Sequence, residues 1–236
     1  MSVVTSPPGG SAPPELTAIG GTCHRNVVLG AFPVLAAVLL ITGGALTPHG
    51  LDKPITTITT ALRELPIAHA HADRLYVSNM LVMFGLGALG VSFAAIATLV
   101  RDRAASLATV AAVLGGLAAC CGVIVNVLVG YNLAAAATAN TTPIAAAKVL
   151  VSANTSAFAV ILFAGYLGGL AIATILAGIA LWRCGSVPRW LAVLFTIGLL
   201  MGAIAPPGIL NAILSIPFAI AMVLLAARAS QAASRV

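Results

Sequence analysis

The residues best suited to chemistry lie in the segment PIAHAHADRLY, residues 66–76, which contains His69, His71 and Asp73. Imidazole nitrogens and carboxylate oxygens bind metal ions and transfer protons. If the segment is helical from Pro66, His69 and Asp73 are four residues apart and share a face, whereas His71 lies about 200° away from that face. If the segment is extended, His69 and His71 share a face and form a two-histidine ligand pair.

A metal site at this segment needs further ligands, because zinc sites in proteins have three or four of them. His49 and Asp52, in the motif HGLD, precede the segment and could complete such a site. The segment also leads directly into a long apolar run, and histidines at a boundary between water and lipid need no bound metal. We therefore expect a polar collar around a membrane helix, with no metal and no cofactor, and keep a metal site and another ligand-binding role as alternatives.

Neutral polar residues inside the apolar runs form a second candidate group. They are Asn79, Asn126, Tyr166 and Asn211. At a rise of about 1.5 Å per residue, the three asparagines fall at similar depth near the outer ends of their helices, and Tyr166 lies deeper. We expect hydrogen bonds between helices, which contribute about 0.6 kcal/mol each on average. The alternative is an outward-opening pocket lined by these four residues beneath His69 and Asp73.

The elements that position these residues are membrane helices. The chain of 236 residues is 61% hydrophobic and 7% charged, with a mean hydropathy of +1.12, whereas soluble domains carry about 25% charged residues. Runs of roughly 20 apolar residues cross a bilayer as helices. The sequence therefore predicts an all-α polytopic membrane bundle of about six transmembrane helices. The predicted spans are 26–46, 76–100, 106–131, 155–182, 187–204 and 207–227.

The segments outside these spans are short. Residues 1–25 are rich in Pro, Gly and Ser and lack the basic and apolar regions of a signal peptide, so we expect a disordered cytoplasmic tail. The six-helix transmembrane domain occupies residues 26–227, and residues 228–236 form a cytoplasmic C-terminal tail.

Basic residues predict the orientation of the bundle. With the N-terminus inside, seven Lys and Arg residues lie on the inner side and four on the outer side, which favours the N-in, C-in topology. The two short inner turns, RDR and RCGSVPR, carry the clearest excess. Trp182 and Trp190 flank the second inner turn, and Tyr76 and Tyr131 lie at outer helix ends, as interfacial aromatic residues do.

The outer connections are long enough to contain short interfacial helices. In residues 47–75, Pro54 suits the first position of a helix. In residues 132–154, Thr142 is placed to cap a helix that opens at Pro143.

Small residues at four-residue spacing predict where the helices approach one another, because membrane helices associate through close packing. These stripes are Gly165, Gly169, Ala173 and Ala177; Gly198 and Gly202; and Ala112, Gly116 and Cys120. In a chain so rich in Ala and Gly, such spacings also arise by chance.

The segment LAGIALWRCGSVPRWLAVL resembles a motif between the fourth and fifth helices of a family of small six-helix bacterial membrane proteins, of actinobacterial type, known as a domain of unknown function. The resemblance is carried within residues 178–191, by Gly178, Leu181, Arg183, Gly185, Pro188, Arg189 and Leu191. The chain departs from the family at Cys184, where serine is frequent, and at its histidine-rich second helix. The resemblance implies the six-helix architecture and no catalytic residue.

These observations favour a non-enzymatic, multi-pass protein of the bacterial cell membrane that binds lipid or a hydrophobic small molecule, or that serves as an accessory component. An alternative is a membrane-embedded enzyme acting on an isoprenoid or lipid, with Asp73 or Glu64 as acid and His69 or His71 as base. A small-solute exporter is a second alternative, although no charged residue lies deep in a span. The expected partners are membrane lipids; the net charge of +6 is too sparse for a nucleic-acid surface.

Overall fold

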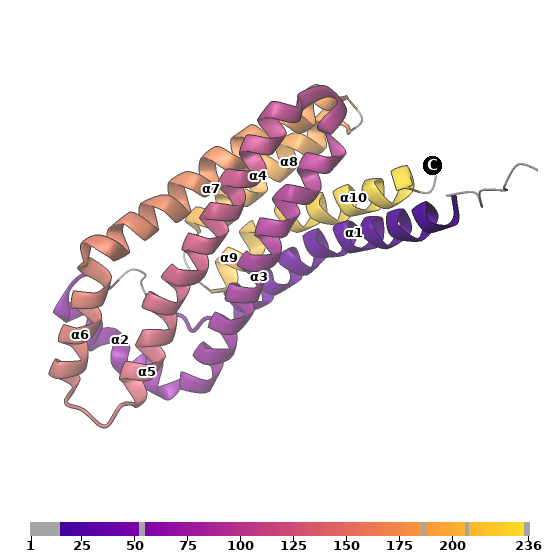
Figure 1. The fold of residues 1–236 in the computed structure, drawn as a ribbon. Helices are drawn as coiled ribbons and strands as arrows, with labels where there is room; N and C mark the ends of the chain where they lie inside the picture. The colour runs from indigo at the N-terminus through magenta and orange to yellow at the C-terminus, as the bar shows by residue number, and fades with distance from the viewer. Residues whose placement is uncertain (1–14, 52–54, 186, 206–207, 234–236) are drawn as a thin grey trace, which may run out of the picture.

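The computed structural model describes residues 15–51, 55–185, 187–205 and 208–233, and within these ranges it is helical without strands (Figure 1). Loops, turns and one π-helical turn, η1, separate the α-helices. In chain order the elements are α1 (Glu15–Leu46), α2 (Ile58–Ala70), α3 (Ala72–Leu99), α4 (Arg101–Asn126), η1 (Val127–Tyr131), α5 (Asn132–Thr138), α6 (Pro143–Thr155), α7 (Ala157–Cys184), α8 (Arg189–Ile204), α9 (Ile209–Leu214) and α10 (Ile216–Ala233).

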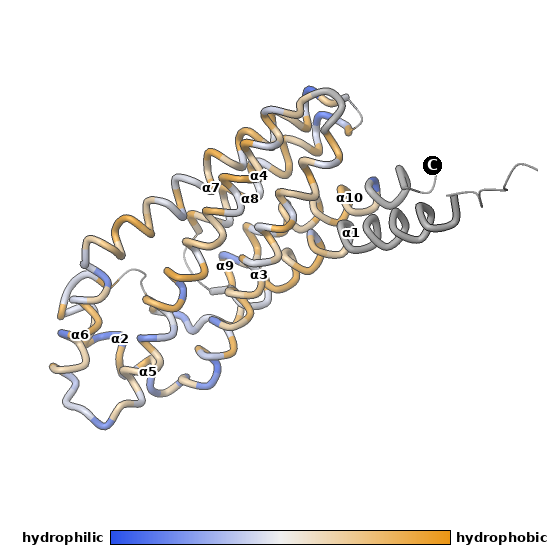
Figure 2. The backbone as a smooth tube through the Cα atoms, viewed as in Figure 1, coloured by the Kyte–Doolittle hydropathy of each residue, from blue (hydrophilic) through white to orange (hydrophobic). Residues whose placement is uncertain are grey.

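Long apolar helices identify a membrane protein. In the described part of the chain, three segments are long and apolar enough to cross a bilayer: Ala72–Leu99, Ala104–Thr138 and Ala157–Cys184. Most of their exposed side chains are apolar, with Leu117 60% and Ile161 69% exposed, and Figure 2 shows hydrophobic residues along most of their length. Apolar surface of this extent is stable only against lipid or another apolar surface.

Shorter apolar helices accompany the three long ones. They are Gly30–Leu46, Arg189–Ile204 and Ile216–Arg228, within α1, α8 and α10. The α3–α4 and α7–α8 turns lie together at one end of the bundle, and α2, α5 and α6 gather at the opposite end (Figure 1). We call the first the turn end and the group of α2, α5 and α6 the cap.

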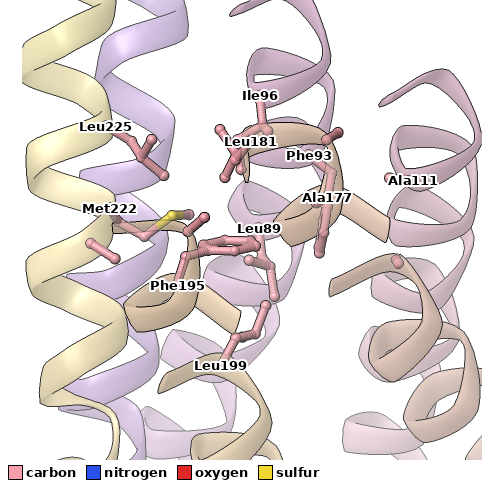
Figure 3. Close-up of a cluster of buried hydrophobic side chains, with 14 of the residues drawn as sticks. Leu89, Phe93, Ile96, Ala111, Ala177, Leu181, Phe195, Leu199, Met222 and Leu225 are labelled. Atoms are coloured by element: carbon pink, nitrogen blue, oxygen red, sulfur yellow. The ribbon is translucent and has the colours of Figure 1, made fainter. Parts of the chain in front are cut away.

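The core of the bundle forms around α8. Phe195 on this helix is fully buried, and Figure 3 shows it among apolar side chains that include Leu89 of α3 and Met222 of α10. Its ring centroid lies 6.3 Å from that of Phe93 and 6.3 Å from that of Phe218. These contacts join α8 to α3 and α10.

Small residues bring α7 against α4, as the stripe on α7 predicts. A methyl carbon built on Gly169 would lie 3.2 Å from Cβ of Ala118 on α4, and Ala173 of the same stripe is fully buried. The stripe predicted on α4 is confirmed only at Gly116, whose Cα lies 3.7 Å from a carbon built on Gly90 of α3, whereas Cys120 is exposed. The buried face of α4 includes Ala118 instead.

The cap has its own apolar core, which contains Leu65 of α2, Leu133 of α5 and Leu150 of α6. The predicted cap of α6 is confirmed, since Thr142 Oγ1 accepts a hydrogen bond from the Ala145 backbone N–H at 3.4 Å and Pro143 opens the helix. The start predicted for the preceding interfacial helix is wrong.

That preceding helix, α2, begins at Ile58, after Pro54. Its cap is Thr57, whose Oγ1 accepts from the Thr60 backbone N–H at 3.2 Å. Pro54 itself lies outside the described residues. The sequence also placed the outer end of the third span at Tyr131, whereas the helix continues through η1 and α5 to Thr138.

The terminal segments and the sixth span differ from their predicted bounds. Helix α1 begins at Glu15 and so includes part of the predicted tail 1–25, of which residues 1–14 lie outside the described residues. Helix α10 extends to Ala233, into the predicted tail 228–236. The sixth span divides at Ser215, two residues before Pro217, because proline has no backbone N–H and restricts the residue before it.

Candidate functional site

The histidine-rich segment is neither one continuous helix nor an extended strand. His71 has φ −128° and ψ 28°, and it separates α2 from α3. His69 lies in the last turn of α2, whereas Asp73 lies in the first turn of α3, and all three side chains are exposed. The shared face of His69 and Asp73 that a continuous helix predicts is therefore wrong, as is the extended His69–His71 pair.

His69 connects two helices of the cap. Its Nδ1 lies 2.8 Å from the carbonyl oxygen of Ala137 on α5. A carbonyl oxygen only accepts, so the imidazole carries a proton on Nδ1 and donates. This contact gives His69 a structural role at the junction of α2 and α5.

Arg74, in the same segment, closes the end of α1. Its Nε donates to the Leu46 carbonyl at 2.7 Å and its Nη2 donates to the Ala45 carbonyl at 3.3 Å. The last carbonyls of a helix have no partner within the helix and carry partial negative charge, which a guanidinium stabilises. Sequence reasoning assigned Arg74 only to the outer charge count and missed this contact.

No three His, Cys, Asp or Glu residues of the described part of the chain lie close enough together to hold a metal ion. His49 lies against the connection between α8 and α9, with its Nδ1 3.0 Å from a carbon built on Gly208. Asp52, the remaining predicted ligand, lies outside the described residues.

Glu64, the second candidate acid, is sealed inside the cap. Its side chain is fully buried, and Oε1 lies 3.5 Å from Nη2 of the largely exposed Arg63. A buried ionised carboxylate requires compensation by hydrogen bonds or charge. This position gives a substrate no access to Glu64 while the cap is folded.

Asn79 and Asn126 come together between α3 and α4. Asn126 Nδ2 donates to the backbone carbonyl of Asn79 at 2.8 Å. The Asn79 side chain is 1% exposed and packs directly against Gly130 in η1, where any side chain would collide with it. This is the hydrogen bonding between helices that the sequence favours.

Asn211 and Tyr166 lie elsewhere in the bundle. Asn211 Nδ2 donates to the Gly202 carbonyl at 2.9 Å, near the end of α8, and Oδ1 lies 2.8 Å from a carbon built on Gly44 of α1. The Tyr166 ring lies 2.7 Å from a carbon built on Gly122, so it packs between α7 and α4. The pocket that would unite the three asparagines and Tyr166 stays a prediction.

A further polar cluster, missed by sequence reasoning, joins α1 to α3. Ser78 Oγ donates to the Gly43 carbonyl at 2.7 Å, and Thr47 Oγ1 lies 2.8 Å from Ser78 Oγ. All three residues are buried. The available signal was a serine next to Asn79 on a helix, opposite a glycine that permits close approach.

Replacing Asn126 with leucine should lower the melting temperature in detergent by a few degrees. The change removes the bond to Asn79, and hydrogen bonds between membrane helices are worth on the order of 1 kcal/mol. Thermal unfolding followed by circular dichroism measures the shift. Asn140→Leu, in the exposed loop after α5, is the control and should leave the melting temperature nearly unchanged. A higher melting temperature for Asn126→Leu would contradict the structural role and favour a hydrated pocket.

A cavity of about 410 Å³ lies between α7 and α8 near the turn end. Its sides are apolar and include Ile175 and Ile179 of α7 and Val193 and Ile197 of α8. We call it the α7–α8 groove.

Tightly packed residues close the bottom of the α7–α8 groove, and charged and aromatic residues close its end. Gly178 packs directly against Thr196 Oγ1 at the bottom. Trp182 and Arg183 close the end next to the turn, and Cζ of Arg189 lies 5.4 Å from the Trp182 ring centroid.

The hydrogen bonds of the candidate polar groups go mainly to backbone carbonyls. The lining of the α7–α8 groove contains no carboxylate and no imidazole, and His69, Arg74, Asn126 and Asn211 all bond to backbone carbonyls of neighbouring elements. Comparisons of the chain with protein-family models, with curated proteins and with solved structures find no match.

Proposed function

We propose that the chain crosses the cell membrane six times, with both termini on the cytoplasmic face and the cap on the outer face. The three shorter apolar helices support the additional spans, because α1 packs against α3, α8 packs against α7, and α10 packs against α1 and α8. The arginine-containing α3–α4 and α7–α8 turns share one end of the bundle (Figure 1), as the positive-inside rule requires of cytoplasmic turns. The resemblance of residues 178–191 to a six-helix family agrees with this architecture and stays a prediction.

Within this topology, we propose a non-enzymatic membrane component that binds lipid. The observation that carries the proposal is which groups the polar side chains bond to. His69, Asn126 and Asn211 bond to the backbone of neighbouring elements, whereas the α7–α8 groove offers an apolar surface. An acid–base catalyst must instead point its proton-carrying atom at a substrate.

The two alternative functions that the sequence suggests, an enzyme and a small-solute exporter, have weaker support. An enzyme acting on an isoprenoid or lipid would have to use exposed groups such as His71 and Asp73, which do not line the α7–α8 groove. A proton-coupled exporter normally places an ionisable group at membrane depth. The three long apolar segments contain no Asp, Glu, Lys or Arg between residues 75 and 100, 104 and 138, or 157 and 182.

Lipid extracts test the non-enzymatic proposal. Cells that produce the wild-type chain, cells that produce the combined His69→Gln, His71→Gln and Asp73→Asn variant, and cells without the protein should give the same lipid and isoprenoid species by mass spectrometry. Similar amounts of the two proteins in the membrane are the control. A species formed or consumed only with the wild type would contradict the proposal and identify an enzyme.

A further inference from the structure

The α7–α8 groove is open towards the surroundings of the bundle. Ile179 is 40% exposed on one wall and Ile197 is 55% exposed on the other. The lining runs along α7 from Ile175 to Arg183, a length of about 12 Å at 1.5 Å per residue. Its volume of about 410 Å³ lies within the range of roughly 300–1,000 Å³ typical of ligand pockets. A chain of methylene groups matches this long and apolar shape.

Positive charge borders one end of the groove. Arg183 lines it, and among the described side chains none forms a hydrogen bond or ion pair with the Arg183 guanidinium. The Arg189 guanidinium packs over the Trp182 ring, which lines the same end. The turn RCGSVPR that connects the two helices contains no acid. An anionic group is therefore the complement of this end.

We propose that the α7–α8 groove binds an anionic phospholipid, with one acyl chain between α7 and α8 and the phosphate held by Arg183 and Arg189. A guanidinium binds phosphate oxygens through parallel N–H donors. Trp182 places its amphipathic ring between the apolar wall and the charged end, as aromatic residues at membrane interfaces do. The inference deepens the proposed lipid-binding function and rests on it, since the groove meets phospholipid only in a chain that lies in a membrane.

A zwitterionic phospholipid or a second copy of the chain fits the groove less well. A zwitterionic headgroup brings a cation next to the two arginines. A second copy would cover the apolar walls but would have to supply an acid opposite Arg183. The two acids whose side chains the structure describes, Glu64 and Asp73, lie in the cap and at the start of α3. Phospholipid, by contrast, supplies the acyl chain and the phosphate in one molecule.

Native mass spectrometry of the delipidated, full-length protein in detergent tests this site. Phosphatidylglycerol and phosphatidylcholine are titrated separately, and the lipid-bound fraction is measured. We expect tighter binding of phosphatidylglycerol, and a roughly tenfold loss of that binding in the Arg183→Gln, Arg189→Gln double variant. Binding of phosphatidylcholine should not change. Arg228→Gln, which removes an exposed arginine from α10, is the matched control and should have less than about a twofold effect.

A second variant tests the acyl-chain part without changing charge. Val193→Phe fills the groove from its exposed wall and should weaken binding of both lipids, whereas Val113→Phe on the exposed face of α4 should not. Circular dichroism verifies that each variant is folded. Equal affinity of the wild type for the two lipids would overturn the proposal. Equal loss of phosphatidylglycerol binding in the double variant and in Arg228→Gln would also overturn it. So would a dimer of the wild type that Val193→Phe dissociates and Val113→Phe does not. These measurements use purified protein, so they do not depend on the orientation in the membrane or on the lipid-extract result.

Discussion

Replacing Gly198 with alanine should destabilise the protein by about 1–3 kcal/mol, the usual cost of overpacking a tight core. A methyl carbon at this position on α8 would lie 2.8 Å from Cα of Phe218, and it would also collide with the Phe218 backbone nitrogen. These are backbone atoms of α10, so no side-chain rotation relieves the collision. Pro217 restricts the chain immediately before them, and α8 would have to move away from α10.

The measurement is thermal unfolding in detergent. A change of 1 kcal/mol shifts the melting temperature by about 2–4 °C in a chain of this length, so the expected decrease for Gly198→Ala is several degrees. Gly168→Ala on α7 is the matched control, because a carbon built there meets no atom within 4 Å. Alanine also favours the helix over glycine, so this control should be neutral or slightly stabilising. Equal melting temperatures for the two variants would contradict the packing of α8 on α10.

The features that the sequence predicts well depend on residues close together in the chain. An apolar run of about 20 residues is sufficient to predict a membrane helix, and the cap of α6 follows from Thr142 and Pro143 alone. The α7 stripe is also local, since residues four apart share a helix face. Its partner, Ala118 of α4, was not predictable in the same way, because that choice depends on how two helices rotate against each other.

The predictions that failed depend on distant contacts or on a local signal that was not used. His69 bonds to Ala137, 68 positions later in the chain, and no spacing near His69 indicates that partner. The break at Ser215 did have a signal, because Pro217 follows it closely, but the surrounding apolar run concealed it.

The same distinction between local signals and distant contacts applies to the candidate site. The sequence alone shows which polar residues the site contains. It also places them near helix ends, which is consistent with their structural roles in the fold. Their partners came only from the fold: Asn126 bonds to Asn79 because η1 and Gly130 let α3 and α4 approach closely. Sequence reasoning could therefore predict hydrogen bonds between helices as a class and could not identify their acceptors.

The central claim is that the cap lies outside the cell and the turn end inside. The two termini share the inner face only if the number of crossings is even, as six is. The loop after α5 is exposed at the cap, and position 186 falls in the sequence between the end of α7 at Cys184 and the start of α8 at Arg189. A single cysteine introduced at either position shows on which side of the membrane that position lies.

Labelling of single cysteines on intact cells tests this claim most directly. Cys23, Cys120, Cys121 and Cys184 are first replaced by alanine, and Asn140→Cys or Ser186→Cys is then introduced. An impermeant thiol reagent should label the variant at position 140 almost completely and the variant at position 186 hardly at all, and both should be labelled after permeabilisation. The reverse pattern would contradict the orientation, and equal labelling on intact cells would contradict the arrangement of the spans.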